Sequence, residues 1–196
     1  PETTKARISF KVSSFFSNSV IAVSESARKF YIENHFYNQK KLRVIYNCPG
    51  FKPMEHKPRI KEFSERSVIK LVNIGSLRVQ KGQIFLIRAM KILQSSGLRF
   101  QLDIYGADRF GYGDTLHKEI RANNLCNVFV HDETKDVEKV MQQSDIFIAS
   151  SIHEAFHMAL LEALCVGLPS VATNIPPHQE ILESMQAKVL VEPANA

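Results

Sequence analysis

The sequence predicts an α/β fold in which a parallel sheet has helices on both faces. After residue 67, short apolar stretches typical of strands alternate with stretches in which apolar residues recur every three or four positions. Glycine closes two of the strand-like stretches, at Gly75 and Gly106. Strands alternating with helices indicate βαβ units, whose parallel strands are buried between two layers of helices.

The N-terminal part of the chain is expected to form a separate piece. Residues 3–17 are expected to form a basic amphipathic helix, and a second helix is expected to start at Ser24 and continue over 25–36. Short strands are expected at 20–23 and 42–46. A turn at 47–50 follows, and the charged, proline-containing stretch 51–66 is typical of a linker or a long surface loop.

Strands and helices alternate regularly in the C-terminal part of the chain. Strands are expected at residues 68–74, 100–105, 128–131, 145–149, 170–172 and 189–191, and helices at 80–94, 114–123, 135–143, 157–166 and 178–185. Ligands of such sheets bind at the carboxyl ends of the strands, so the loops that follow the strands are expected to line one edge. We expect residues 1–45 to be a remnant of another, N-terminal domain together with the interdomain connection, and residues 46–196 to form a ligand-binding domain.

The composition excludes several classes of protein. With 44% apolar and 23% charged residues the chain is ordinary for a globular protein, and no run of 18 apolar residues predicts a transmembrane helix. Three widely spaced cysteines and no CxxC pair argue against a disulfide framework or a cysteine zinc site, and favour a reducing cytoplasm. The chain begins with proline and has no signal-like segment, so we expect a fragment of a longer protein.

The net charge of +5 is concentrated near the N-terminus. Residues 1–43 hold eight Lys and Arg against three acids, whereas the remainder is neutral overall. Such an excess is typical of a solvated helix face, or of a segment that contacts anionic lipid. We expect no nucleic acid partner, and peripheral contact with the inner face of a membrane stays open for residues 1–43.

Residues 144–174 contain the most informative pattern: strand, polar loop, helix, turn and strand. Two carboxylates, Glu154 and Glu162, have seven residues between them, the first in the loop and the second inside the helix. The first amides of a helix that follows a strand are unpaired and attract anions. Carboxylates suit hydroxyl groups rather than phosphate, so the region predicts a ligand that carries both phosphate and sugar.

Several motifs occur together in a known order: Gly75-Ser-Leu followed by Lys81-Gly82, DIYG at 103–106, VFVH at 128–131, SDIFIASS at 144–151, Glu154-x7-Glu162 and GLPSVAT at 167–173. The set resembles the donor-binding, C-terminal domain of retaining glycosyltransferases of family 4. The resemblance implies the Rossmann-like half of a GT-B fold. It also implies a UDP- or GDP-type sugar donor, a glycan, lipid or small-molecule acceptor, retention of anomeric configuration, and no metal or other cofactor.

The resemblance also assigns roles to residues. It places Glu162 on the ribose diol, Glu154 as the catalytic residue beside the transferred sugar, and Lys81 on the diphosphate. The loop after Val130 is expected near the base, and the turn that contains Gly75 and Arg78 near the donor. Backbone amides meet the diphosphate at residues Phe156, His157, Met158, Ala159 and Leu160.

The sequence departs from the family pattern at two places. Ser76 stands where the family usually has arginine, and Arg78 is the candidate to replace it. Ala155 and His157 stand where the usual EGFG motif has glycines, which reduces the space for a close diphosphate.

Other interpretations of these motifs remain open. A nucleotide-sugar-binding module without catalysis would suit a degenerate site. A related sugar-nucleotide epimerase or phosphorylase is an enzymatic alternative. Residues 153–157 also spell HExxH, a zinc hydrolase motif that requires both histidines on one helix.

Overall fold

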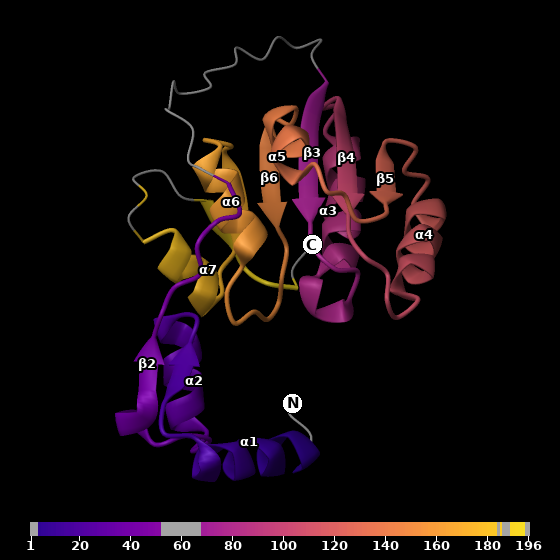
Figure 1. Ribbon diagram of the computed structural model, residues 1–196. Coiled ribbons are helices and arrows are strands. Elements are labelled where there is room, and N and C mark those ends of the chain that lie inside the picture. The colour runs from indigo at the N-terminus through magenta and orange to yellow at the C-terminus, as the bar shows by residue number, and fades with distance from the viewer. Residues whose placement is uncertain (1–3, 52–67, 184, 186–188, 195–196) are drawn as a thin grey trace. The chain divides into compact units, whose positions relative to one another are not determined.

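The computed structural model describes residues 4–51, 68–183, 185 and 189–194 (Figure 1). The chain divides into two compact units, residues 1–48 and 49–196. Almost all of the expected linker at 51–66 lies outside the described residues. The functional assignment of the two parts, a remnant of another domain and a donor-binding domain, stays a prediction.

The first unit combines two helices with two short parallel strands. α1 (Thr4–Phe16) precedes β1 (Val20–Ala22), and α2 (Glu25–Glu33) is followed by a 3₁₀ turn, η1 (Gln39–Lys41), and β2 (Leu42–Val44). The Oγ atom of Ser24 accepts a hydrogen bond of 2.9 Å from the amide of Ala27, which caps α2 as the sequence predicts. Among the described residues, no helix of either unit is long and apolar enough to cross a bilayer.

The second unit is built on a six-stranded parallel sheet, which confirms the predicted fold class. Its order is β5-β4-β3-β6-β7-β8. The strands are β3 (Ile69–Ile74), β4 (Phe100–Tyr105), β5 (Val128–His131), β6 (Ile146–Ala149), β7 (Ser170–Thr173) and β8 (Val189–Val191). The chain builds outward from β3 to β5, and then returns to the other side of β3 with β6.

The helices of this unit are α3 (Gln83–Ser95), α4 (Tyr112–Ala122), α5 (Val137–Gln142), α6 (Met158–Cys165) and α7 (Pro176–Ile181). Two expectations were wrong in detail. The helix expected from residue 80 is interrupted, because Gly82 is left-handed and separates a 3₁₀ turn, η2 (Val79–Lys81), from α3. The last helix begins and ends earlier than expected, because Pro176 and Pro177 fit the first helical turn, where an amide donor is not needed.

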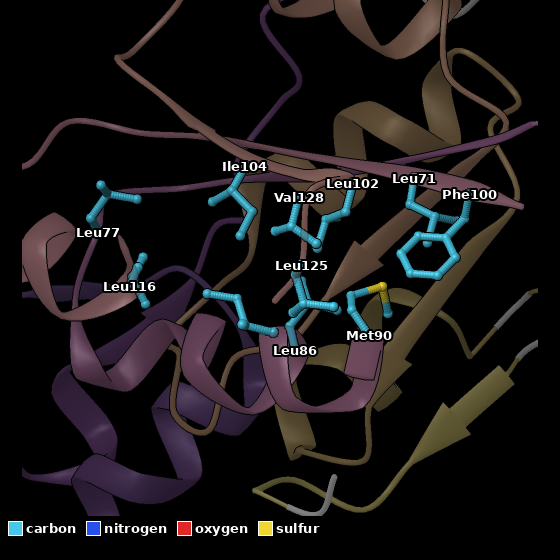
Figure 2. Close-up of a cluster of buried hydrophobic side chains, with 11 residues drawn as sticks. Leu71, Leu77, Leu86, Met90, Phe100, Leu102, Ile104, Leu116, Leu125 and Val128 are labelled. Atoms are coloured by element: carbon cyan, nitrogen blue, oxygen red, sulfur yellow. The ribbon is translucent and has the colours of Figure 1, made fainter. Parts of the chain in front are cut away.

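Alternate residues of the central strands pack into two separate hydrophobic cores, one on each face of the sheet. Leu71 of β3 packs with side chains of α3, α4, β4 and β5, and Figure 2 shows this cluster. Val72, the next residue, packs on the other face with Met141 of α5 and Leu160 of α6. Both faces of the sheet are therefore buried, which explains why its strands read as nearly continuous apolar runs.

The order of the strands reverses between β3 and β6, so their crossovers lie on opposite faces of the sheet. A crevice at the carboxyl ends of the strands is expected at such a point. The turn after β3 is tied to the end of β6 there. The amide of Ile152 donates to the carbonyl of Gln80 (2.9 Å), and Ser150 Oγ donates to the carbonyl of Lys81 (2.8 Å).

Gly82 permits this contact for two reasons. Its φ of +66° is a conformation that residues with a side chain rarely adopt. A Cβ atom at this position would also lie 2.0 Å from the carbonyl oxygen of Ser150. Glycine is thus required both by the backbone and by the space between η2 and β6.

We expect Gly82→Ala to lower the free energy of unfolding by about 2–5 kcal/mol, from backbone strain and the displaced Ser150 carbonyl together. Gly97→Ala is the matched control, because Gly97 has a φ of +80° with nothing within 4 Å of an added Cβ. The control should lose only about 1–2 kcal/mol. Urea unfolding measures both, and equal losses would contradict a tight approach at Gly82.

Candidate functional site

An ion pair lies at the carboxyl ends of β3 and β6. Lys81 Nζ, at the end of η2, lies 2.5 Å from Glu154 Oε1, in the loop after β6. Ser151 Oγ donates to the same oxygen at 2.8 Å. The side chains of Lys81 and Glu154 are only 17% and 11% exposed. The two charges are thus held at the switch point of the sheet and remain within reach of a ligand.

A buried polar residue supports the ion pair from inside the sheet. Asn73, in β3, donates its side-chain amide to the carbonyl of Ile148 at 2.8 Å and reaches Ser150 Oγ at 3.4 Å. Asn73 is only 3% exposed, and this contact joins the end of β3 to the end of β6. The sequence signal for this role is a single amide in a strand that is otherwise apolar except for Lys70.

The N-terminal end of α6 follows the same loop. His157 occupies the position before the first helical residue, with an extended backbone, and makes no side-chain cap. The first amides of α6, at Met158, Ala159 and Leu160, therefore have no partner from the cap side chain. Such an end carries partial positive charge and unpaired donors, which suit a phosphate group.

A second histidine supports the start of α6. His157 Nδ1 lies 2.7 Å from Nε2 of His178 in α7, and the two rings are stacked. His178 Nδ1 lies 2.9 Å from the carbonyl of Thr173, at the end of β7. Since that carbonyl only accepts, His178 carries its proton on Nδ1, and His157 donates to His178. His178 was not among the predicted site residues, because only the fold brings it to His157.

Burial is the main cause that lowers the pKa of both histidines. The rings are 2% and 0% exposed. The pKa of His157 is also lowered by the charge of Lys81 and by His178, and the carbonyl of Ile74 partly offsets this. For His178, the carbonyl of Thr173 and the charge of Glu154 oppose the effect of burial. Both rings are therefore neutral at pH 7.

Glu162 lines a cavity whose lining residues do not include the ion pair. The cavity has a volume of about 710 Å³, and Gly50, Phe51 and residues of α5 also line it. Burial raises the pKa of its carboxyl, and a hydrogen bond with the backbone of Gly50 acts in the opposite direction. The carboxylate thus faces an open cavity large enough for part of a nucleoside, beside the loop that follows β5.

A second hollow, of about 380 Å³, lies at the carboxyl ends of β3 and β4. Gly75, Ser76 and Arg78 line it, with Arg109 and Thr134. Gly75 borders the ion pair, because a Cβ added at this position would lie 3.4 Å from Lys81 Cε and 3.5 Å from Nζ. The hollow is therefore adjacent to Lys81.

The fold brings together part of the predicted set. Lys81, Glu154, Gly75, Arg78 and the start of α6 gather around the ends of β3 and β6. The side chain of Val130 instead packs against the core, so only its backbone can face a ligand. The roles assigned to these residues stay predictions.

The HExxH interpretation does not fit the geometry. Residues 153–156 are not helical, His153 is exposed, and His157 precedes α6 and pairs with His178. In the part of the chain that the structure describes, no three histidine, cysteine or carboxylate side chains are arranged to hold a metal ion.

Residues 55–196 match the family described as Glycosyl transferases group 1. The chain is also 30% identical over 164 residues to an uncharacterized glycosyltransferase of Methanocaldococcus jannaschii, in a match that covers 79% of this chain and 39% of that protein. The chain therefore belongs to the group 1 glycosyltransferases. Membership of family 4, the C-terminal position and retention stay predictions.

Solved structures show the same fold. HepE of Anabaena, in complex with UDP and glucose, superposes with a TM-score of 0.81 at 22% identity, covering 98% of this chain and 54% of that one. TarM of S. aureus, in a complex that contains UDP, gives a TM-score of 0.78 at 20% identity, covering 98% of this chain and 37% of that one. The fold is that of GT-B glycosyltransferases, and this chain spans about half of those proteins or less.

The buried histidines predict how stability depends on pH. Their folded pKa values lie below the ordinary value of about 6.5, so between the two values the unfolded chain holds more protons. Stability is therefore complete above about pH 6.5 and falls below it, by up to about 1.4 kcal/mol per pH unit for each ring.

Urea unfolding between pH 8 and pH 5 measures this slope. His178→Asn should make it shallower, whereas His117→Gln, at an exposed position on α4, should leave it unchanged. Equal slopes for wild type and His178→Asn would contradict a lowered pKa of the buried His178.

Proposed function

We propose that the full-length protein transfers a sugar from a nucleotide diphosphate sugar, of UDP or GDP type, to a glycan, lipid or small acceptor, with retention. The observation that carries this proposal is the Lys81–Glu154 pair beside the open start of α6, at the switch point of the sheet. Family membership supports sugar transfer, and the UDP in the HepE and TarM complexes supports the donor class. Retention rests on the resemblance to family 4.

The proposed chemistry places positive charge where negative charge develops. As the bond between the anomeric carbon and the diphosphate oxygen breaks, the electron pair leaves with the nucleotide diphosphate. Lys81 and the first amides of α6 are held in place by the fold, so they stabilise this charge with little rearrangement. Glu162 accepts hydrogen bonds from the ribose hydroxyls, and Glu154 lies beside the transferred sugar. We expect no metal or other cofactor.

A binding module without catalysis is the second candidate. Ala155 and His157 occupy positions where the family pattern has glycine, and His157 is packed against His178. A module of this kind would bind the nucleotide and would not transfer the sugar.

Glu162→Ala should weaken nucleotide binding by about 10- to 100-fold, because a hydrogen bond to a charged group contributes about 1.5–3 kcal/mol. Calorimetric titration of the chain with UDP, GDP and ADP, in the presence of chelator, measures this and identifies the base. Glu183→Ala, at an exposed carboxylate after α7, is the control and should bind normally. Saturable binding of none of the three nucleotides to the wild-type chain would contradict the proposed function.

Lys81→Met should weaken the binding of UDP or GDP by about 10-fold or more, because the lysine is proposed to contact phosphate. The corresponding nucleoside, which lacks phosphate, should bind Lys81→Met and wild type equally. Lys91→Met, at an exposed position on α3, serves as the control. An equal loss for nucleotide and nucleoside would place Lys81 away from the phosphates.

Peripheral membrane contact through residues 1–43 is part of the proposal. α1 exposes Ile8, Val12, Phe15 and Phe16, the two phenylalanines at 81% and 79%. These apolar side chains could enter a bilayer surface, and the Lys and Arg of residues 1–43 would attract its anionic headgroups. Binding to anionic liposomes at low salt should be lost when these Lys and Arg residues are replaced by glutamine. Co-sedimentation tests this, and no binding by the wild-type chain would exclude such contact.

A further inference from the structure

Two loops form a rigid wall of the hollow beside Lys81. One follows β3 and the other follows β4, and backbone hydrogen bonds join them. The amide of Gly75 donates to the carbonyl of Tyr105 at 2.9 Å, and the amide of Leu77 donates to that of Ala107 at 3.0 Å. The two loops approach so closely that a Cβ at Gly106 would lie 2.0 Å from the carbonyl oxygen of Gly75.

The second loop is also fixed at its far end. The carboxylate of Asp108 accepts hydrogen bonds from the amides of Tyr112 (2.8 Å) and Gly113 (2.9 Å), at the start of α4. Gly111, with a φ of +69°, makes the turn into that helix. Phe110 therefore has a defined place next to the loop after β3, although its side chain is 70% exposed.

Phe110 contacts the guanidinium group of Arg78. Arg78 Cζ lies over the ring, 4.6 Å from its centre, a distance at which a cation is attracted to the face of an aromatic ring. Arg78 Nε is buried and has no hydrogen-bond partner among the described residues. The guanidinium is thus held by an aromatic ring, and no carboxylate of the described residues forms an ion pair with it.

Arg78 lines the hollow that borders the Lys81–Glu154 ion pair. It lines this hollow together with Gly75, and a Cβ added at Gly75 would lie 3.4 Å from the side chain of Lys81. Arg109, from the same loop as Phe110, lines this hollow as well, and Glu133 is the acid among its lining residues. An anionic group bound at Lys81 would therefore meet a second cation on the other side of Gly75.

We propose that Phe110 is a positioning residue for donor binding: its ring orients Arg78 so that the guanidinium contacts a phosphate of the nucleotide. This inference rests on the proposed function, because it takes the anion at Lys81 to be the donor diphosphate. An aromatic ring can hold arginine in this way without satisfying its donors, which stay available for phosphate oxygens. Ser76 bears no charge, so Arg78 is the cation that this turn presents to the hollow.

The test compares UDP and GDP binding by calorimetry for the 196-residue chain and for four variants. Phe110→Leu keeps an apolar side chain but removes the aromatic face, and it should weaken binding about three- to tenfold. Phe110→Trp keeps the face and should retain wild-type affinity, which a general need for bulk at this position does not predict. Arg78→Ala should weaken binding at least as much as Phe110→Leu.

The double variant Arg78→Ala/Phe110→Leu should bind like Arg78→Ala alone, because Phe110 acts through Arg78. Uridine and guanosine, which lack phosphate, should bind Phe110→Leu and wild type equally. Normal nucleotide binding by Phe110→Leu, or additive losses in the double variant, would overturn the role of Phe110 and leave the proposed function intact. Failure of the wild-type chain to bind either nucleotide would overturn both.

Discussion

The approach of the turn after β3 to the end of β6 is the constraint on which the site depends. In a parallel sheet neighbouring strands end at the same edge, but their loops normally diverge toward the helices that follow. Gly82 removes the side chain that would separate these two loops, and Ser150 then bonds to the backbone of Lys81. The close approach of the two loops lets Lys81 reach Glu154, since one residue comes from each loop.

Burial controls the electrostatics around this contact. His157 and His178 are enclosed between the start of α6 and the end of β7, where a charged ring would lose hydration and face the charge of Lys81. The two neutral histidines support the start of α6, and the His157 side chain makes no cap hydrogen bond with its amides. Arg78 is arranged differently, because its half-buried guanidinium lies over the ring of Phe110 and its Nε has no hydrogen-bond partner among the described residues.

The site is also divided among the switch point of the sheet and two hollows. Lys81 and Glu154 lie at the switch point, Arg78 lines the hollow on the side of β4, and Glu162 faces the cavity beside α5. A nucleotide diphosphate sugar is long enough to contact several such places at once, with its phosphates near the cations and its ribose near Glu162. The division fits an elongated ligand with chemically distinct parts better than a compact one.

Much of the fold followed from the sequence alone, because local patterns encode it. Short apolar runs predicted the strands, and the bounds of β4, β5 and β8 match the expected ones. Apolar residues with a period of 3.6 predicted most of the helices. The Glu154-x7-Glu162 spacing and the start of α6 were also readable, since they lie within one short segment. The tertiary structure decided what depends on residues distant in the chain: the left-handed break at Gly82, the His157–His178 pair, and the stacking of Arg78 on Phe110. No local period encodes these contacts, because each depends on how closely two loops approach or on which ring the fold buries beside another.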